Sequence, residues 1–218
     1  MGSEINYDYI YARNIELANK VLKECSSEVV AWKKFYKEFY RDPDGYRIKE
    51  KNGVTCTADA LLSAWRIYNH EGFNEQFIEA YEQYRKEPIF FFPREQGGIN
   101  QSRAAFFGDR IDHFLFDLKR YCSGEESKLE SVYQKEKTKK WLESFGKVNG
   151  RSNFSEIADW YQLVGVFVNA DYEVFDLEKD DESVISKYCD NYTSEWTDKY
   201  YDNLKIKIDM FMIRSVEK

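Results

Sequence analysis

The sequence predicts a mainly α (α+β) fold: a single helical domain with a small β-hairpin or short sheet. Hydrophobic residues recur at three- and four-residue spacing along most of the chain, which is the period of an amphipathic helix. One Asn-Gly pair, Asn52-Gly53, lies between two short alternating segments, a pattern typical of a hairpin. Only 3 of the 218 residues are proline and 11 are glycine, and no linker divides them. We therefore expect residues 1–218 to form one globular domain.

The first two elements are predicted to be helices. Residues 5–23 carry a weak apolar period, and Ser26 or Ser27 can cap a second helix because a serine side chain accepts from a free amide at a helix start. The second helix has an apolar stripe, expected to be buried, made of Val29, Trp32, Phe35, Tyr36 and Phe39. The turn sequence at 42–45 contains Pro43 and Gly45 and is expected to end it.

The hairpin follows, with strands expected at 46–49 and 54–57. Thr57 is predicted to cap a helix that carries Leu61, Leu62, Trp65 and Tyr68, and Gly72 is expected to close it. Asn74 is predicted to begin the next helix, which ends before Pro88 and has an apolar face made of Phe77, Ile78, Tyr81 and Tyr84.

The central part of the chain is predicted to alternate between apolar segments and turns. Residues 89–92 form a short apolar run, which fits either a buried strand or a lead-in to a loop, and Pro93 ends it. We expect a loop over 93–108 and helices over 109–122, 126–145 and 155–167, with Gly146 and Gly150 separating the last two.

The C-terminal part is predicted to be one helix that begins at Ser183. Residues 204–212 alternate in a way that also fits a strand. Because no glycine or proline interrupts 183–214, we expect a helix there.

Composition sets the class of protein. Aromatic residues make up 17% of the chain, so we expect a core built from rings. No run of about 18 apolar residues and no signal-like start occurs, which indicates a soluble, cytoplasmic protein without a membrane segment. The four cysteines, Cys25, Cys56, Cys122 and Cys189, lie far apart, as free thiols in a reducing compartment do. Neither metal-ligand spacing nor a phosphate-loop, dinucleotide or nucleophile-elbow motif is present, so no metal and no cofactor is predicted.

The net charge of −7 is concentrated in one stretch. Residues 171–198 hold ten acidic residues against two lysines, a net charge of −8, which leaves about +1 for the rest of the chain. Nucleic-acid binding wants a basic stripe, so this acidity argues against it. The stretch fits a solvated loop and helix start, or a docking face for a basic partner.

The segment from Pro88 to Tyr121 is the strongest candidate for function. It brings an apolar run, a loop with two glycines and a helix start together, and loops on a rigid scaffold often carry binding groups. Arginine forks suit phosphate or carboxylate. The candidate binding residues are Arg94, Asn100, Arg103, Asp109, Arg110 and Asp112.

A structural interpretation competes with this one. Acids near the start of a helix are favoured by its dipole, and Arg110 with Asp117 fits a surface ion pair. A lone histidine such as His113 is more often structural than catalytic. If the arginines pair with Asp109, Asp112 and Asp117, the segment is a structural ion network.

The same segment resembles a bacterial family of uncharacterised proteins that has only a domain-of-unknown-function label. The resemblance rests on Phe92-Pro93-Arg94, on Ile99-Asn100 with Arg103, and on the run 109–120 with its Asp-Arg-x-Asp start and Lys-Arg end. It covers the chain from Pro88 onward. Phe116 and Tyr121 stand where the family pattern has an acid and a histidine. The resemblance implies that the candidate residues act together, and it implies no reaction.

Three functions remain open. The first is a binding or regulatory domain that engages an anionic small molecule or protein partner through the 93–110 loop. The second is an enzyme acting on a nucleotide or other phosphorylated substrate, with Asp109 or Asp112 as acid or base. The third is an interaction protein of defence or counter-defence type that uses its acidic face. The sequence does not determine the oligomeric state.

Overall fold

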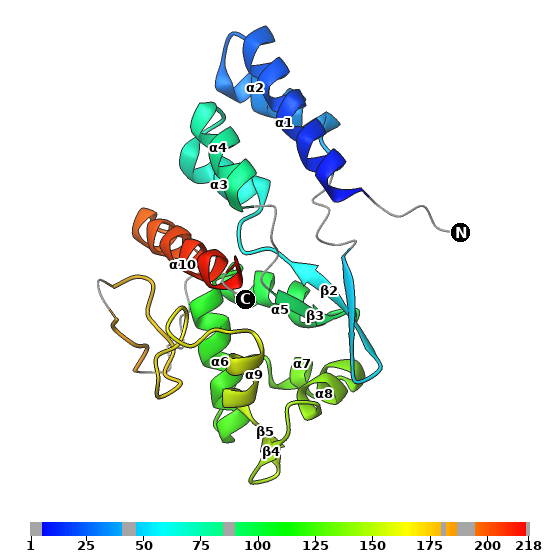
Figure 1. The fold of residues 1–218 in the computed structure, drawn as a ribbon, viewed down its shortest axis with the longest axis vertical. Helices are drawn as coiled ribbons and strands as arrows, with labels where there is room; N and C mark the ends of the chain where they lie inside the picture. Colours follow the sequence, from blue (N-terminus) through cyan, green and yellow to red (C-terminus); the bar gives the residue numbers. More distant parts are fainter. Residues whose placement is uncertain (1–5, 41–46, 85–89, 180–181, 187–194, 217–218) are drawn as a thin grey trace. The chain divides into compact units, whose positions relative to one another are not determined.

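The computed structural model describes residues 6–40, 47–84, 90–179, 182–186 and 195–216. These residues are mainly helical, with one three-stranded sheet and one two-stranded hairpin, so the predicted fold class is confirmed (Figure 1). Contacts divide the chain into two compact units: Met1–Ile48 with Ala58–Ile89, and Lys49–Thr57 with Phe90–Lys218. We call them unit 1 and unit 2. The single domain stays a prediction.

The described part of unit 1 contains four helices, α1 Tyr7–Glu24, α2 Glu28–Glu38, α3 Ala64–Glu71 and α4 Glu75–Tyr84. Helix α1 packs against α2 and α4, and α3 packs against α4. Ser27 caps α2 as predicted, because its side chain accepts from Val30 N. The cap predicted at Thr57 is wrong: Ser63 caps α3, and Thr57 lies within a strand. Gly72 ends α3 and Asn74 accepts from the first amides of α4, as expected.

Aromatic rings fill the core of unit 1, as the composition predicts. Trp32 and Phe35 of α2 are buried among Phe73 and Phe77, and Trp32 stacks on Tyr68 with ring centroids 4.1 Å apart. Of the predicted α2 stripe, Val29 is 54% and Tyr36 is 52% exposed, and Phe39 is half-buried at the end of the helix. The turn expected at 42–45 and the helix end expected at Pro88 lie outside the described residues.

The three-stranded sheet has the order β1-β2-β3, with β1 Ile48–Lys51, β2 Val54–Asp59 and β3 Phe90–Pro93. Asn52 and Gly53 both have positive φ, at 53° and 68°, which is the turn geometry that makes an Asn-Gly pair favourable. The predicted hairpin is therefore confirmed. In β2, side chains alternate between buried and half-buried, and Phe90 and Phe92 are buried in β3, so one face of the sheet covers the core.

Within the described part of unit 2, the other elements are six helices and a hairpin: α5 Ile99–Phe107, α6 Ile111–Ser123, α7 Glu130–Tyr133, α8 Glu136–Glu143, β4 Lys147–Val148, β5 Arg151–Ser152, α9 Phe154–Trp160 and α10 Asp198–Val216. Strands β4 and β5 are antiparallel. The buried rings of this unit include Phe92, Phe114, Trp141 and Tyr161.

The loop predicted over 93–108 is wrong, because most of it is helix α5. The buried positions of α5 are Ile99, Arg103 and Phe107, spaced by four residues. Helical periodicity is recognised in a sequence from the spacing of apolar residues. Because the middle position of this buried stripe is an arginine, the sequence does not show the helical period here. The helix over 109–122 is confirmed as α6.

Three other predicted helices differ in length. The single helix over 126–145 is wrong, since α7 and α8 are separate elements joined at Gln134 and Lys135. The helix over 155–167 ends early, at Trp160, because Gln162 turns with a φ of 56°.

The last helix begins at Asp198 rather than at Ser183. Val184 forms a bridge with Phe175, so that part is extended, and residues 187–194 lie outside the described chain. The helix expected over 204–212 is confirmed.

Three observations bear on the class of protein. Over the described residues, no helix combines the length and apolar character needed to cross a membrane. The same residues contain no group of three or more His, Cys, Asp or Glu side chains placed to hold a metal ion. Cys25, Cys56 and Cys122 are free thiols.

Candidate functional site

The predicted site residues occupy a turn, a helix and a second helix start. The chain leaves β3 at Pro93, turns at Gly97, and enters α5 after Gly98. Gly108 and Asp109 then adopt positive φ, at 56° and 65°, and Arg110 stands at the N-cap of α6. Aspartate tolerates this backbone region better than most residues. Among the six predicted residues, Arg110 pairs with Asp112 and Arg103 pairs with Asp109, whereas Arg94 and Asn100 belong to neither pair.

Arg110 and Asp112 form a buried ion pair. Their side chains are 0% and 1% exposed, and Nε and Nη2 of Arg110 donate to the two carboxylate oxygens at 3.2 and 2.7 Å. The carboxylate also accepts from the backbone amides of His113 and Leu177 at 2.9 and 3.3 Å. Asp112 is thus surrounded by protein donors, which leaves a substrate no access to it.

The same pair connects α6 to two distant segments. Arg110 also forms an ion pair with Glu178, and its guanidinium carbon lies 4.3 Å from the ring centroid of Tyr200 in α10. Tyr200 is buried, and its hydroxyl accepts from Ile111 N at 2.9 Å. This arrangement holds the start of α6, the 177–178 segment and α10 together, which is a structural role.

Arg103 and Asp109 form a second, weaker pair. Nη2 of Arg103 lies 3.4 Å from Oδ1 of Asp109, and the Arg103 side chain is 2% exposed. Asn100 is half-buried in the first turn of α5, and its Oδ1 atom is buried without a hydrogen-bond partner among the described residues. The Arg103–Asp109 pair therefore connects α5 to the turn that follows it.

Arg94 differs from the other arginines because its side chain is exposed. Its backbone is fixed: the amide donates to Thr55 O at 2.9 Å, and the carbonyl accepts from Nζ of Lys137 at 3.3 Å. Its guanidinium makes neither an ion pair nor a hydrogen bond within the part of the chain that the structure describes. Of the predicted arginines, Arg94 is the one whose donors face solvent.

Two lysines flank Arg94. Nζ of Lys135 donates to Gln96 O at 2.7 Å, and Lys137 reaches the carbonyl of Arg94. The carboxylate of the neighbouring Glu95 accepts hydrogen bonds from the backbone amides of Lys137 and Thr138 at the start of α8, and it forms no ion pair with Arg94. Backbone carbonyls hold these ammonium groups without neutralising their charge.

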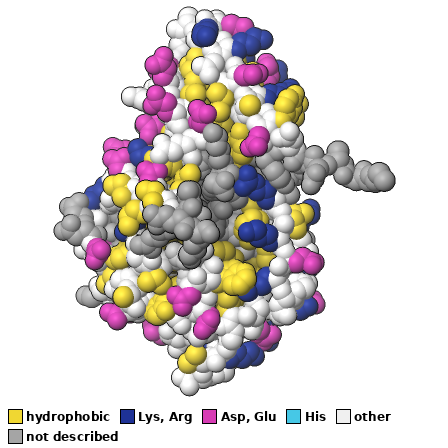
Figure 2. Space-filling model, in the orientation of Figure 1, with side chains coloured by type: hydrophobic (Ala, Val, Ile, Leu, Met, Phe, Trp, Pro, Cys, Tyr) yellow, Lys and Arg dark blue, Asp and Glu magenta, His cyan; other side chains and the backbone are white. Residues whose placement is uncertain are grey.

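The hairpin adds further cations to this side of unit 2. Nζ of Lys49 lies 4.4 Å from the ring centroid of Phe91, and Nζ of Lys51 lies 3.3 Å from that of Trp160. The side chain of Asn52 donates to the carbonyl of Lys140 at 3.4 Å, which places α8 beside the hairpin turn. In Figure 2, dark-blue basic side chains interleaved with hydrophobic ones lie over the hairpin. We call Lys49, Lys51, Arg94, Lys135, Lys137 and Lys140 the basic face.

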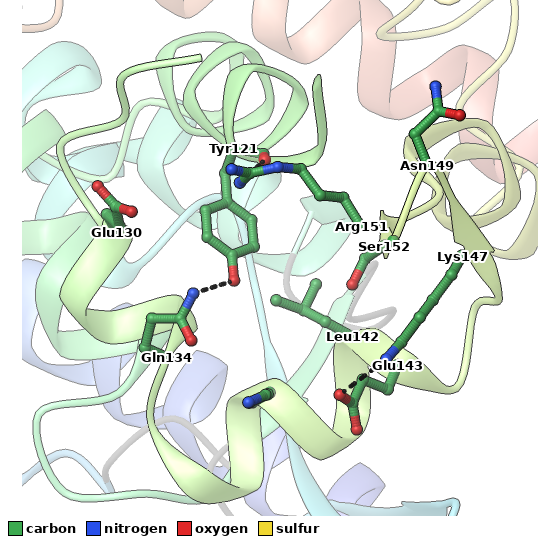
Figure 3. Close-up of a pocket in the computed structure, with 11 residues that line it drawn as sticks. Tyr121, Glu130, Gln134, Leu142, Glu143, Lys147, Asn149, Arg151 and Ser152 are labelled. Carbon is green, nitrogen blue, oxygen red and sulfur yellow. Dashed lines mark hydrogen bonds and ion pairs between the residues drawn. The ribbon is translucent and has the colours of Figure 1, made fainter. Parts of the chain in front are cut away.

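A pocket lies on another part of unit 2, beside the β4–β5 hairpin. Its volume is about 420 Å³, and it is lined from α6, α7, α8 and the hairpin. Figure 3 shows the Arg151 side chain near Tyr121, with Gln134 on one side and the Lys147–Glu143 pair on the other. The sequence carries no signal for this pocket, because its residues are spread over 121–152 without a motif.

Asp117 does not pair with Arg110, and the predicted surface ion pair is wrong. Its carboxylate is buried and accepts from the amides of Lys128 and Leu129, at 2.6 and 3.2 Å, and from the hydroxyls of Ser127 and Tyr133. Burial raises the pKa of Asp117, while these hydrogen bonds act in the opposite direction. Asp117 therefore fixes the segment that leads into α7.

His113 is half-buried. Burial lowers its pKa below the ordinary value of 6.5, against the charge of Asp112, and the charge of Arg110 lowers it further. His113 is thus kept neutral beside the buried ion pair.

Acids from the 171–198 stretch neutralise cations of α6. Glu178 pairs with Arg110, and Glu173 pairs with Lys119 at 2.5 Å. Asp176 pairs with Lys179 at 2.8 Å within the stretch itself. Internal ion pairs therefore neutralise part of the negative charge of this stretch.

Comparisons of the chain with protein-family models, with curated proteins and with solved structures find no match.

Proposed function

We propose that the protein is a binding module that holds an acidic segment of a protein partner on its basic face. The observation that carries this proposal is the exposed guanidinium of Arg94, which has no partner among the described residues. Two lysines contact the same turn, since Lys137 donates to the carbonyl of Arg94 and Lys135 donates to that of Gln96. Such a group gains most from an external carboxylate, because it can form two parallel charge-assisted hydrogen bonds.

The geometry around Arg94 supports binding without rearrangement. Hydrogen bonds to Thr55 and Lys137 fix its backbone, and Glu95 is occupied at the start of α8. A fixed backbone loses no further conformational entropy when the segment binds, so only the side chain of Arg94 has to become ordered. The role predicted for the 93–110 segment is therefore assigned to its first residues.

An acidic protein segment suits this face better than a nucleic acid does. The whole chain has a net charge of −7, which repels a long polyanion and gives it no steering. A short segment with a few carboxylates meets only the local positive charge, because charges beyond about 8 Å are screened at physiological salt.

The alternative of a phosphoryl-substrate enzyme gains no support from the geometry. It requires Asp109 or Asp112 beside solvent-facing arginines, and Asp112 is buried against Arg110. The alternative of an acidic interaction face is also weakened, since Glu173 and Glu178 are engaged in ion pairs with α6.

Fluorescence anisotropy with a labelled oligoglutamate peptide tests the proposal. The double variant Arg94→Gln/Lys137→Gln should bind about tenfold more weakly than the unchanged chain, a loss of about 1.4 kcal/mol. Binding of the unchanged chain should weaken as salt increases, because exposed charges carry it. Circular dichroism checks that both proteins remain folded.

The matched control is Lys20→Gln/Lys33→Gln, which removes the same charge from exposed positions on α1 and α2 of unit 1. Equal affinities for the control and the Arg94 double variant would contradict the proposal. A single-stranded oligonucleotide that binds more tightly than the peptide would contradict the choice of a protein partner.

A further inference from the structure

The pocket beside the β4–β5 hairpin has an excess of positive charge directed at its interior. Lys147 pairs with Glu143 at 3.2 Å, so this lysine is neutralised (Figure 3). Arg151 and Lys139 also line the pocket, and neither forms an ion pair within the described residues. One other acid, Glu130, lines it. The lining as a whole therefore carries an uncompensated cation.

Arg151 is positioned by the end of α6. Its Nη1 donates to the carbonyl of Tyr121 at 3.4 Å, and its side chain lies against Gly124, where an added Cβ would come within 2.8 Å of Nε. Gly124 caps α6 with a φ of 81°, a conformation that favours glycine. The helix end thus fixes the guanidinium while leaving most of its donors unused.

Neutral donors complete the lining. The Tyr121 hydroxyl accepts from Nε2 of Gln134 at 2.8 Å, which leaves its own proton for another acceptor (Figure 3). Burial raises the pKa of Tyr121, so the hydroxyl remains protonated at neutral pH. Ser152 contributes a second hydroxyl, and Leu142 provides an apolar wall. Cations, hydroxyl donors and one apolar wall are the groups that recognise an oxyanion on a small carbon skeleton.

We propose that this pocket binds a small molecule through one oxyanion group, a carboxylate or a phosphate, held by Arg151, while Lys139 adds a second positive charge to the lining. The volume of about 420 Å³ lies within the range of ordinary ligand pockets, about 300–1,000 Å³. The site is separate from the basic face, and its ligand is a small molecule rather than a protein segment.

A nuclear magnetic resonance titration of the full chain tests the proposal with two probes, inorganic phosphate and succinate. At least one probe should shift the signals of Arg151, Tyr121 and Gln134 and saturate, with a Kd on the order of 1 mM. The probe that binds more tightly identifies phosphate or carboxylate as the group. Sodium chloride at equal ionic strength should give no saturating shift.

Arg151→Gln and Lys139→Gln should each weaken binding of that probe about tenfold. Lys139→Gln leaves the contact between Arg151 and Tyr121 intact, so it separates ligand binding from a helix-capping role. Lys20→Gln is the charge-matched control, and the Arg94→Gln/Lys137→Gln variant should titrate like the unchanged chain.

Two results would overturn the proposal. One is the absence of a saturable shift with both probes. The other is an unchanged titration in Arg151→Gln and Lys139→Gln. Neither result affects the basic face, because that face is tested with a peptide and different variants.

Discussion

The buried pair of Arg110 and Asp112 gives the sharpest test of whether this segment is structural. Asp112→Asn removes the charge and turns one acceptor into a donor that faces the Arg110 guanidinium. Two arginine hydrogen bonds and the amides of His113 and Leu177 depend on that carboxylate. Removing one partner of a buried ion pair lowers the free energy of unfolding by about 3–5 kcal/mol. We expect about 3 kcal/mol, since Glu178 remains beside Arg110 and is 29% exposed.

The assay is urea unfolding followed by circular dichroism and tryptophan fluorescence. With a denaturant slope of about 2 kcal/mol per molar urea, a loss of 3 kcal/mol lowers the midpoint by about 1.5 M. Glu136→Gln, an exposed acid on α8, is the control and should change the free energy of unfolding by less than about 0.5 kcal/mol.

The double variant Arg110→Met/Asp112→Leu adds a second measurement. Replacing both charges with apolar groups should cost less than Asp112→Asn alone, because no uncompensated charge stays buried. Side chains that serve binding or catalysis often destabilise the fold, so replacing one of them often raises the free energy of unfolding. An Asp112→Asn protein with an unchanged or higher midpoint would therefore refute the structural assignment and return Asp112 to the candidate site.

Three further predictions concern local features. His113→Gln should flatten the loss of stability below about pH 6.5. Folding lowers the pKa of His113, so as pH falls the unfolded chain binds a proton at this residue before the folded chain does, and stability falls. Urea midpoints measured at each pH would show the difference. Ser27→Ala should cost about 1 kcal/mol through loss of the α2 cap, detectable as a lower thermal midpoint, whereas Ser26→Ala should not. Gly124→Ala should lower the free energy of unfolding by about 1 kcal/mol, because Gly124 has a positive φ. The added Cβ should also displace Arg151 and so weaken probe binding in the pocket. Unchanged probe binding would show that the position of the guanidinium does not depend on this glycine.

Local signals in the sequence identified much of the fold. The hairpin was predictable because Asn52 and Gly53 tolerate positive φ, and that preference belongs to the residues themselves. The start of α2 was predictable for a similar reason, since Ser27 satisfies an amide only three residues away. Helix α5 was not predictable in this way, because Arg103 occupies the central position of its buried stripe.

The candidate site was only partly predictable. The sequence identified Arg94 as a candidate, but it grouped this residue with Arg103 and Arg110, whose side chains are buried. The partners that decide the difference lie far along the chain: Glu178 and Tyr200 for Arg110, and Lys137 beside Arg94. The pocket around Arg151 was missed for the same reason, since Tyr121 and Gln134 meet that residue only in three dimensions.

The sequence by itself determined the mainly helical fold class, the ring-rich core and the Asn-Gly hairpin. Each follows from composition or from preferences that act over a few residues. Only the tertiary structure decided which charges are internal and which face solvent. An arginine has the same chemistry in both places, and the carboxylates that neutralise Arg110 come from the neighbouring Asp112 and from a stretch 68 residues away. Burial and long-range pairing, rather than residue type, separate the structural arginines from Arg94 and Arg151.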